Sequence, residues 1–154
     1  MKIAIGNDHV AIEMKKDIMA HLNEKGYAVT DFGFLEGEAA DYPAYGEKVA
    51  RLVANGTFDL GVLLCGTGAG MAIVANKIPG VRAVVCSEPC TARLAREHND
   101  ANILCFGARV IGTEMAKTIM DAWLGARFQG GRHRKRVEMI KALEDRGNLR
   151  GGVF

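Results

Sequence analysis

Short apolar runs of strand length alternate along this chain with segments of helical periodicity, which is clearest where Val10, Met14, Ile18 and Leu22 recur at every fourth position. A strand that is apolar along its whole length is buried on both faces. The alternation therefore predicts a parallel β-sheet with helices on each side. The expected strands are Lys2–Gly6, Tyr27–Phe32, Leu60–Cys65, Val81–Cys86 and Asn102–Gly107.

This pattern predicts an α/β fold: one domain over residues 1–154, with a doubly wound, Rossmann-like sheet of five parallel strands between helices. After the last strand, Val137, Ile140 and Leu143 form a narrow apolar stripe behind a basic start. Little sheet remains for this C-terminal helix to cover, so it either docks on a partner subunit or is a solvated helix. The tail of residues 149–154 has no pattern and fits a disordered end. The expected helices cover residues 10–22, 45–53, 69–77, 89–98 and 112–124.

Composition and the placement of the cysteines predict a cytoplasmic protein. The formal net charge of +2 gives no argument for binding to nucleic acid or to a membrane. The first apolar run is too short for a signal peptide or a membrane span. The four cysteines lie in or just after strand- and helix-like segments, which favours reduced thiols. Cys86 and Cys90 have no second pair to complete a zinc site, and together with Cys105 they fit core positions.

The strongest signal for chemistry is a cysteine at the end of an apolar strand. Cys65 is followed directly by Gly66, Thr67 and Gly68, and after Ala69 by Gly70. Glycines allow a ligand to approach the backbone, and the first amides of a helix are unpaired donors. Such amides also favour the thiolate form of a cysteine. The turn therefore predicts a site for an oxyanion beside a thiol base.

Three classes of phosphate-binding loop do not fit this turn. A Walker loop would need a Gly-Lys-Ser/Thr sequence, which is not present. A dinucleotide fingerprint would need glycine at position 71, and a phosphatase loop of the Cys-x5-Arg type would need arginine there. Position 71 is Met71. What remains is a thiol beside amide donors, with the hydroxyl of Thr67 available for proton transfer.

Other polar groups follow or precede the expected strands. Asp8 and His9 follow the first strand and Arg109 follows the fifth, so we expect them to face the same crevice as Cys65. Asp8 also fits the N-cap of the next helix. His98 and Asn99 precede the fifth strand, where a histidine also complements a helix dipole. Fixed positive charge suited to phosphate is supplied by Arg109, Arg132 and Arg136.

These segments, taken together, resemble the ribose, galactose and allose phosphate isomerases, the family of type B ribose-5-phosphate isomerases. The resemblance runs in order over nearly the whole chain. Met71 occupies the position where one branch of the family carries a glutamate in place of the cysteine base, so the chain resembles the cysteine branch. The matching segments are 6–9, 41–43, 65–70, 75–77, 82–83, 98–100, 107–109 and 131–136.

The resemblance implies isomerisation of an aldose and a ketose through a cis-enediolate, without a metal or an organic cofactor. It implies that Cys65 moves the proton between C2 and C1 and that Thr67 assists at the oxygens. His98 would open the sugar ring with the help of Asp8. The implied site lies between two subunits of a homodimer, which in some members pairs into a tetramer. The substrate-binding residues implied are His9, Tyr42, Gly66, Gly68, Gly70, Asn99, Arg109, Arg132 and Arg136.

The resemblance implies ribose 5-phosphate and ribulose 5-phosphate as substrates, in the pentose phosphate pathway. One alternative is the same chemistry on allose 6-phosphate or galactose 6-phosphate, which needs room for one more carbon. A second is a non-catalytic sugar-phosphate sensor, which would have no need of Cys65, Thr67 and His98 together. A nucleic-acid module is disfavoured because the basic cluster is short and lacks interleaved aromatic residues.

Overall fold

The computed structural model describes residues 1–35 and 41–149, with side chains described as far as residue 144. Its centre is the five-stranded parallel sheet that the sequence predicts, and the structure gives the strand order as β2-β1-β3-β5-β4. The three inner strands match their expected bounds to within one residue. The strands are β1 (Lys2–Asn7), β2 (Ala28–Asp31), β3 (Leu60–Cys65), β4 (Ala83–Val85) and β5 (Ile103–Gly107).

The two outer strands, β2 and β4, are shorter than expected, because an edge strand pairs on one side only. The first helical segment begins with a short 3-10 turn, η1 (His9–Ala11). A further prediction, that residues 149–154 form a disordered tail, lies outside the described residues except for Leu149. The α-helices are α1 (Ile12–Glu24), α2 (Tyr42–Ala54), α3 (Ala69–Ala75), α4 (Pro89–Asn99), α5 (Thr113–Gly125) and α6 (Arg132–Leu149).

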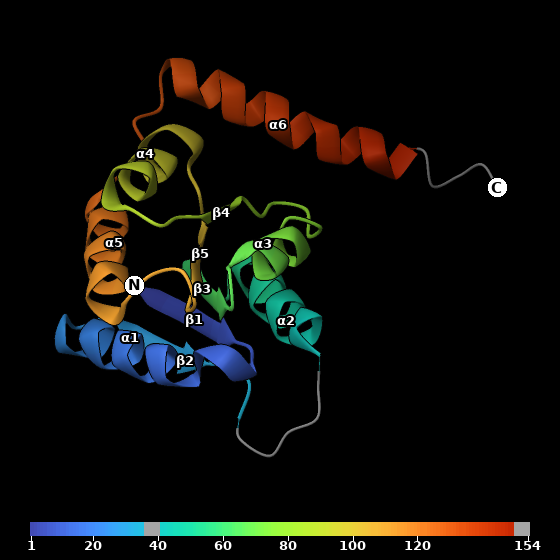
Figure 1. Cartoon of the computed structure of the whole chain (residues 1–154). Coiled ribbons are helices and arrows are strands. Elements are labelled where there is room, and N and C mark those ends of the chain that lie inside the picture. The colour runs from blue at the N-terminus through green and yellow to red at the C-terminus, as the bar shows by residue number, and fades with distance from the viewer. Residues whose placement is uncertain (36–40, 150–154) are drawn as a thin grey trace.

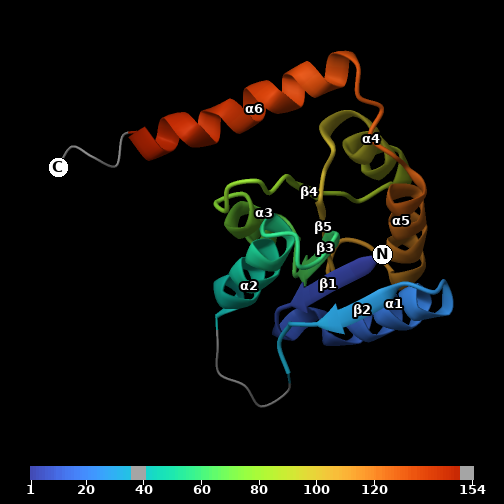
Figure 2. The ribbon, with the colours of Figure 1, turned by 180° about the vertical axis from the view of Figure 1, so that it is seen from behind.

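Helices cover both faces of the sheet, each over its own apolar layer (Figures 1 and 2). One layer packs α1, α4 and α5 against the sheet, with Trp123 and Phe106 fully buried in it. The other packs α2 and α3, with Met71 fully buried. The strand order reverses between β1 and β3, and in such sheets ligands bind beyond the carboxyl ends of the strands at this reversal.

Helix α6 lies apart from the two layers (Figures 1 and 2). Its start packs against α4, and the side chain of Glu144 accepts a hydrogen bond of 2.9 Å from the backbone N–H of Gly80. The side chains of Ile140 and Leu143 are 43% and 61% exposed. None of the helices in the described part of the chain is both long and apolar enough to cross a membrane.

Candidate active site

The turn after β3 holds the sulfur of Cys65 against a backbone donor. The N–H of Gly68 donates to Cys65 Sγ over 3.1 Å, and the cysteine side chain is almost fully buried. Thr67 lies on the exposed side of the turn, where its hydroxyl accepts a bond of 3.3 Å from the N–H of Ala69. A buried thiolate is stabilised by such N–H donors. The turn therefore presents a thiol base beside backbone amides.

Gly68 is required at its position for two reasons. Its φ of +81° lies in the left-handed region, which glycine adopts without strain. A Cβ atom here would also lie 2.9 Å from the carbonyl carbon of Phe106. The helix that follows ends at Ala75 rather than at Lys77 as predicted, so α3 is seven residues long. A helix this short has a small dipole, and the local N–H groups of the turn are the main source of positive potential.

The end of β1 lies directly beside the turn. The backbone N–H of Asp8 donates to the carbonyl of Leu64 over 3.0 Å. Oδ1 of Asp8 accepts a hydrogen bond from the N–H of Val10, which confirms that Asp8 caps the helical segment that follows. Oδ2 takes no part in this hydrogen bond. The ring of His9 packs edge-on against Phe34, with centroids 6.3 Å apart. Asp8 and His9 therefore lie at the same edge of the sheet as Cys65.

The loop that carries Phe34 to this edge is held by an ion pair with a buried lysine, which the sequence analysis did not predict. Lys15, only 3% exposed, lies 2.7 Å from Asp31 and donates to the carbonyl of Phe34 over 3.1 Å. A lysine on the surface of an amphipathic helix is expected to face solvent, so the local sequence gives no sign that Lys15 has such a partner. The pair fixes the loop against which His9 packs.

Two more of the expected residues lie against the glycines of the turn. A Cβ atom on Gly70 would lie 3.0 Å from the ring of Tyr42, and one on Gly66 would lie 3.7 Å from the Cδ of Arg109. The N–H of Arg109 donates to the carbonyl of Gly66 over 3.0 Å. The structure thus gathers one set of expected residues at the carboxyl edge of the sheet, which we call the thiol cluster: Asp8, His9, Tyr42, Cys65, Gly66, Thr67, Gly68, Gly70 and Arg109.

His98 and Asn99 lie elsewhere. They form the end of α4, which starts after the carboxyl end of β4 and returns the chain to the amino end of the parallel strand β5. The imidazoles of His98 and His133 stack there with centroids 4.1 Å apart and planes 3° from parallel. We call this second set, at the opposite edge of the sheet, the histidine cluster: His98, Asn99, Arg132, His133 and Arg136.

His133 is a member that sequence reasoning passed over, although it lies inside the basic segment. Its side chain is 6% exposed. Burial lowers the pKa of His133, and the nearby charges of His98, Arg132 and Arg136 lower it further. The neutral imidazole is therefore the favoured form, and it packs flat against His98.

The two clusters lie far apart within one chain. Cys65 pairs with Gly107 at the end of β5, whereas Asn99 precedes the start of that strand. A strand of five residues at about 3.3 Å per residue puts roughly 15–20 Å between the two edges. One chain alone therefore does not bring His98 to Cys65. The position of α4 between two parallel strands already implies this separation, because a crossover helix ends at the amino edge of the sheet.

The remaining cysteines differ in their surroundings. Cys86 and Cys105 are buried as expected. Burial and, to a lesser degree, the charge of Glu88 raise the pKa of Cys86 to about 11. Burial also raises the pKa of Cys105, with Cys65 and Cys86 adding to it. The expectation that Cys90 is a core residue is wrong, because it lies exposed in the first turn of α4, whose outer face points to solvent.

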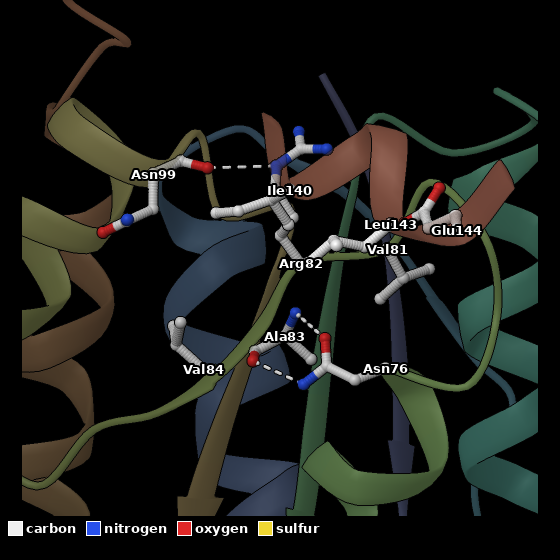
Figure 3. Close-up of a pocket in the computed structure, with 9 residues that line it drawn as sticks. All are labelled: Asn76, Val81, Arg82, Ala83, Val84, Asn99, Ile140, Leu143 and Glu144. Atoms are coloured by element: carbon white, nitrogen blue, oxygen red, sulfur yellow. Dashed lines mark hydrogen bonds between the residues drawn. The ribbon is translucent and has the colours of Figure 1, made fainter. Parts of the chain in front are cut away.

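A groove of about 490 Å³, lined in part by Asn99, lies beside the histidine cluster (Figure 3). Its floor is the segment before and in β4, including Val81 and Arg82, and its other wall is α6, with Ile140 and Leu143. The groove is mostly apolar where α6 faces it. It lacks the thiol and the glycine turn, so we do not assign the chemistry to it.

Known proteins match both the sequence and the fold. Residues 3–140 match the model of the Ribose/Galactose Isomerase family. Ribose-5-phosphate isomerase B of Escherichia coli is 56% identical over 147 residues, which cover 96% of this chain and 99% of that protein.

Two solved structures are similar over nearly their whole length. Ribose-5-phosphate isomerase B of Clostridium thermocellum is 51% identical, with a TM-score of 0.92 over 95% of this chain and 99% of that one. The enzyme of Mycoplasma genitalium, solved with bound ribulose 5-phosphate, is 40% identical, with a TM-score of 0.89 over 94% and 96% of the two chains. By its sequence and by its fold, this chain belongs to the ribose/galactose isomerase family.

Proposed function

We propose that the protein interconverts ribose 5-phosphate and ribulose 5-phosphate. The observation that carries this proposal is the buried sulfur of Cys65, which accepts a hydrogen bond from the N–H of Gly68 where the glycine-rich turn begins. A thiol base beside backbone amides is suited to moving a proton next to a carbonyl while the oxyanion is stabilised. The names of the similar isomerases from Escherichia coli and Mycoplasma genitalium support the same substrate pair.

The reaction is a proton transfer between two carbon atoms. The thiolate of Cys65 removes the proton from C2 of the open-chain aldose, and the electron pair moves to the carbonyl oxygen on C1 to give a cis-enediolate. The amides of the turn bind the developing negative charge. The thiol of Cys65 then delivers this proton to C1. The hydroxyl of Thr67 relays the hydroxyl proton from O2 to O1, which leaves a carbonyl group at C2. No step calls for a metal ion or an organic cofactor, because amides rather than a Lewis acid stabilise the charge.

The remaining roles, ring opening and substrate binding, are shared between the histidine cluster and the thiol cluster. His98 carries an imidazole that exchanges a proton with the ring oxygen of the cyclic sugar, and Asp8 holds a hydroxyl at the thiol cluster. Tyr42 and Asn99 line the sugar. The guanidinium groups of Arg132 and Arg136, one helical turn apart at the start of α6, suit a phosphate group, as do His9 and Arg109.

We infer that the complete site forms between two copies of the chain. The thiol cluster and the histidine cluster lie at opposite edges of one sheet, so one molecule of substrate reaches both only across a subunit contact. Large apolar side chains that remain exposed support this inference. Ile73 on α3 is 61% exposed, Val110 is 58% exposed, and Leu143 on α6 is 61% exposed. A homodimer would bury such groups, and pairing of dimers would give a tetramer.

The substrate is tested by measuring kcat/KM with ribose 5-phosphate, allose 6-phosphate and galactose 6-phosphate after treatment with a chelator. We expect a clear preference for the pentose. A preference for a hexose would keep the mechanism and change the substrate. If none of the three is turned over while binding is detected by calorimetry, the protein is a sensor rather than an enzyme.

A further inference from the structure

Arg82 lines the groove and has no role in the reaction described so far (Figure 3). Its backbone and its guanidinium nevertheless make several hydrogen bonds to other parts of the chain. It lies just before β4, beside the turn that ends α4. We propose that Arg82 is a positioning residue that clamps the last turn of α4 and thereby aims Asn99 at the substrate. The part that concerns Asn99 rests on the proposed function.

The guanidinium holds two consecutive carbonyl groups of the turn. Nε of Arg82 donates to the carbonyl oxygen of Asn99 over 3.0 Å and to that of Asp100 over 2.9 Å. Nη2 donates to Oδ2 of Asp100 over 3.1 Å. The last carbonyl groups of a helix have no partner within the helix, and a cation at this end also complements the dipole. Arg82 supplies both a donor and a charge.

The turn needs such support because its backbone is strained. Asp100 has a φ of +48° and is the only non-glycine residue with a positive φ in the part of the chain that the structure describes. Left-handed backbone at a residue other than glycine is disfavoured, because Cβ comes too close to the following carbonyl oxygen. Arg96 holds the other carboxylate oxygen of Asp100 at 2.5 Å, so two arginines each bind one oxygen of this carboxylate.

Arg82 is itself held in place. Its backbone N–H donates to Oδ1 of Asn102 over 2.8 Å, and the N–H of Asn102 donates back to the carbonyl of Arg82 over 3.1 Å. The next residue, Ala83, is bound in both directions by the side-chain amide of Asn76, at 2.8 and 2.9 Å (Figure 3).

This gives a continuous chain of contacts between the two edges of the sheet. Helix α3 starts at the glycine turn of the thiol cluster and is capped by Asn76, which grips Ala83. Arg82 then grips the carbonyls of Asn99 and Asp100. The Nε atom and one N–H of Nη2 are engaged by acceptors in this turn, so this edge of the guanidinium supports the backbone.

The test is a double-mutant cycle on kcat/KM for ribose 5-phosphate with Arg82→Gln, Asn99→Ala and the double variant. The control is Arg93→Gln. This variant breaks an exposed ion pair between Arg93 and Glu97 on α4, and the substituted residue lies outside the turn at the end of that helix. Misplacing a contact with the substrate is costly, so we expect Arg82→Gln to lower kcat/KM about tenfold or more. Because Arg82 acts through Asn99, the double variant should lose little more than Asn99→Ala alone.

The rate of amide hydrogen exchange measures how firmly the turn is held, and it needs no substrate. The N–H of Ala101 donates to the carbonyl of Ala95 over 3.0 Å within the turn. We expect this amide to exchange faster in Arg82→Gln and at the wild-type rate in Arg93→Gln. Arg82→Lys keeps the charge but loses the planar fork, so it should fall between the wild type and Arg82→Gln.

Three results would overturn the proposal: unchanged exchange at Ala101, losses from Arg82→Gln and Asn99→Ala that simply multiply, or a loss from Asp100→Gly as large as that from Arg82→Gln. Asp100→Gly separates the carbonyl contacts from the carboxylate contact, because glycine keeps the left-handed turn. A loss in this variant as large as in Arg82→Gln would place the role in the carboxylate and also contradict the proposal. If the wild type turns over no sugar phosphate, the proposed function fails, and hydrogen exchange still decides whether Arg82 clamps the turn.

Discussion

Cys65 and His98 lie at opposite edges of the same sheet. Cys65 is the last residue of β3, and His98 lies in the last turn of α4, just before β5 begins. Because β3 and β5 are parallel, with Cys65 beside Gly107, roughly the length of β5 separates the two side chains. This separation is the basis for our proposal that the complete site forms between two copies of the chain.

This arrangement predicts complementation between two inactive variants. Cys65→Ala and His98→Asn should each be inactive alone on the cyclic sugar. Mixed dimers have one site with Cys65 from one chain and His98 from the other. Random exchange of subunits makes half of the dimers mixed, so co-refolding equal amounts should restore about a quarter of the wild-type activity. The activity of the mixture is measured with ribose 5-phosphate.

Recovery of no activity, with the dimer shown by sedimentation, would mean that each chain uses its own residues. A mixture of Cys65→Ala with Cys65→Ser is the matched control. It must stay inactive, because no combination of its subunits contains Cys65.

Removal of the thiol should affect the chemical step rather than binding. A general base contributes about 10²- to 10⁴-fold, so Cys65→Ala should lower kcat by that factor while the dissociation constant of the sugar phosphate changes little. Cys90→Ser is the control, since Cys90 is exposed at the start of α4. Turnover at the wild-type rate in Cys65→Ala would exclude this residue as the base.

Gly68 should be sensitive to a single added methyl group. Gly68→Ala combines left-handed strain with a contact of 2.9 Å to Phe106, and such strain costs about 1–3 kcal/mol of unfolding free energy. Gly56→Ala is the control, because Gly56 has a similar φ of +76° but no atom within 4 Å of the added Cβ. Urea unfolding should show the larger loss for Gly68→Ala, and kcat should fall only in this variant. Equal losses would mean that backbone strain alone sets the cost.

Stability should fall in mild acid because of His133. Its pKa is lower in the folded protein than its usual 6.5, since the side chain is buried beside His98, Arg132 and Arg136. The unfolded chain therefore takes up the proton first, and this contribution to stability is present above pH 6.5 and is lost as the pH falls below it. Urea unfolding at pH 8, 7, 6 and 5 should show a smaller decrease for His133→Gln than for the wild type.

The exposed His9→Gln serves as the control for this pH series, and it should follow the wild type. Identical pH dependence in wild type and His133→Gln would show that His133 carries no such linkage.

Much of the fold follows from the local sequence. The spacing of apolar residues shows which residues of a strand or helix are buried. The bounds of β1, β3 and β5 were therefore predicted to within one residue. The gathering of Asp8, Cys65 and Arg109 was also predictable, because the carboxyl ends of parallel strands share one edge. The place of Tyr42 beside them was expected only from the resemblance to the family. The glycines after Cys65 indicate close backbone approach, which Gly68 and Gly70 both show.

Contacts between distant segments were decided by the tertiary structure. The burial of Lys15 on Asp31, the stack of His98 on His133 and the grip of Arg82 on Asn99 join residues 16, 35 and 17 positions apart. Sequence periodicity records only how a residue faces its own neighbours. Which distant groups meet depends on the path of the chain, and here α4 returns to the amino edge of the sheet and carries His98 away from Cys65.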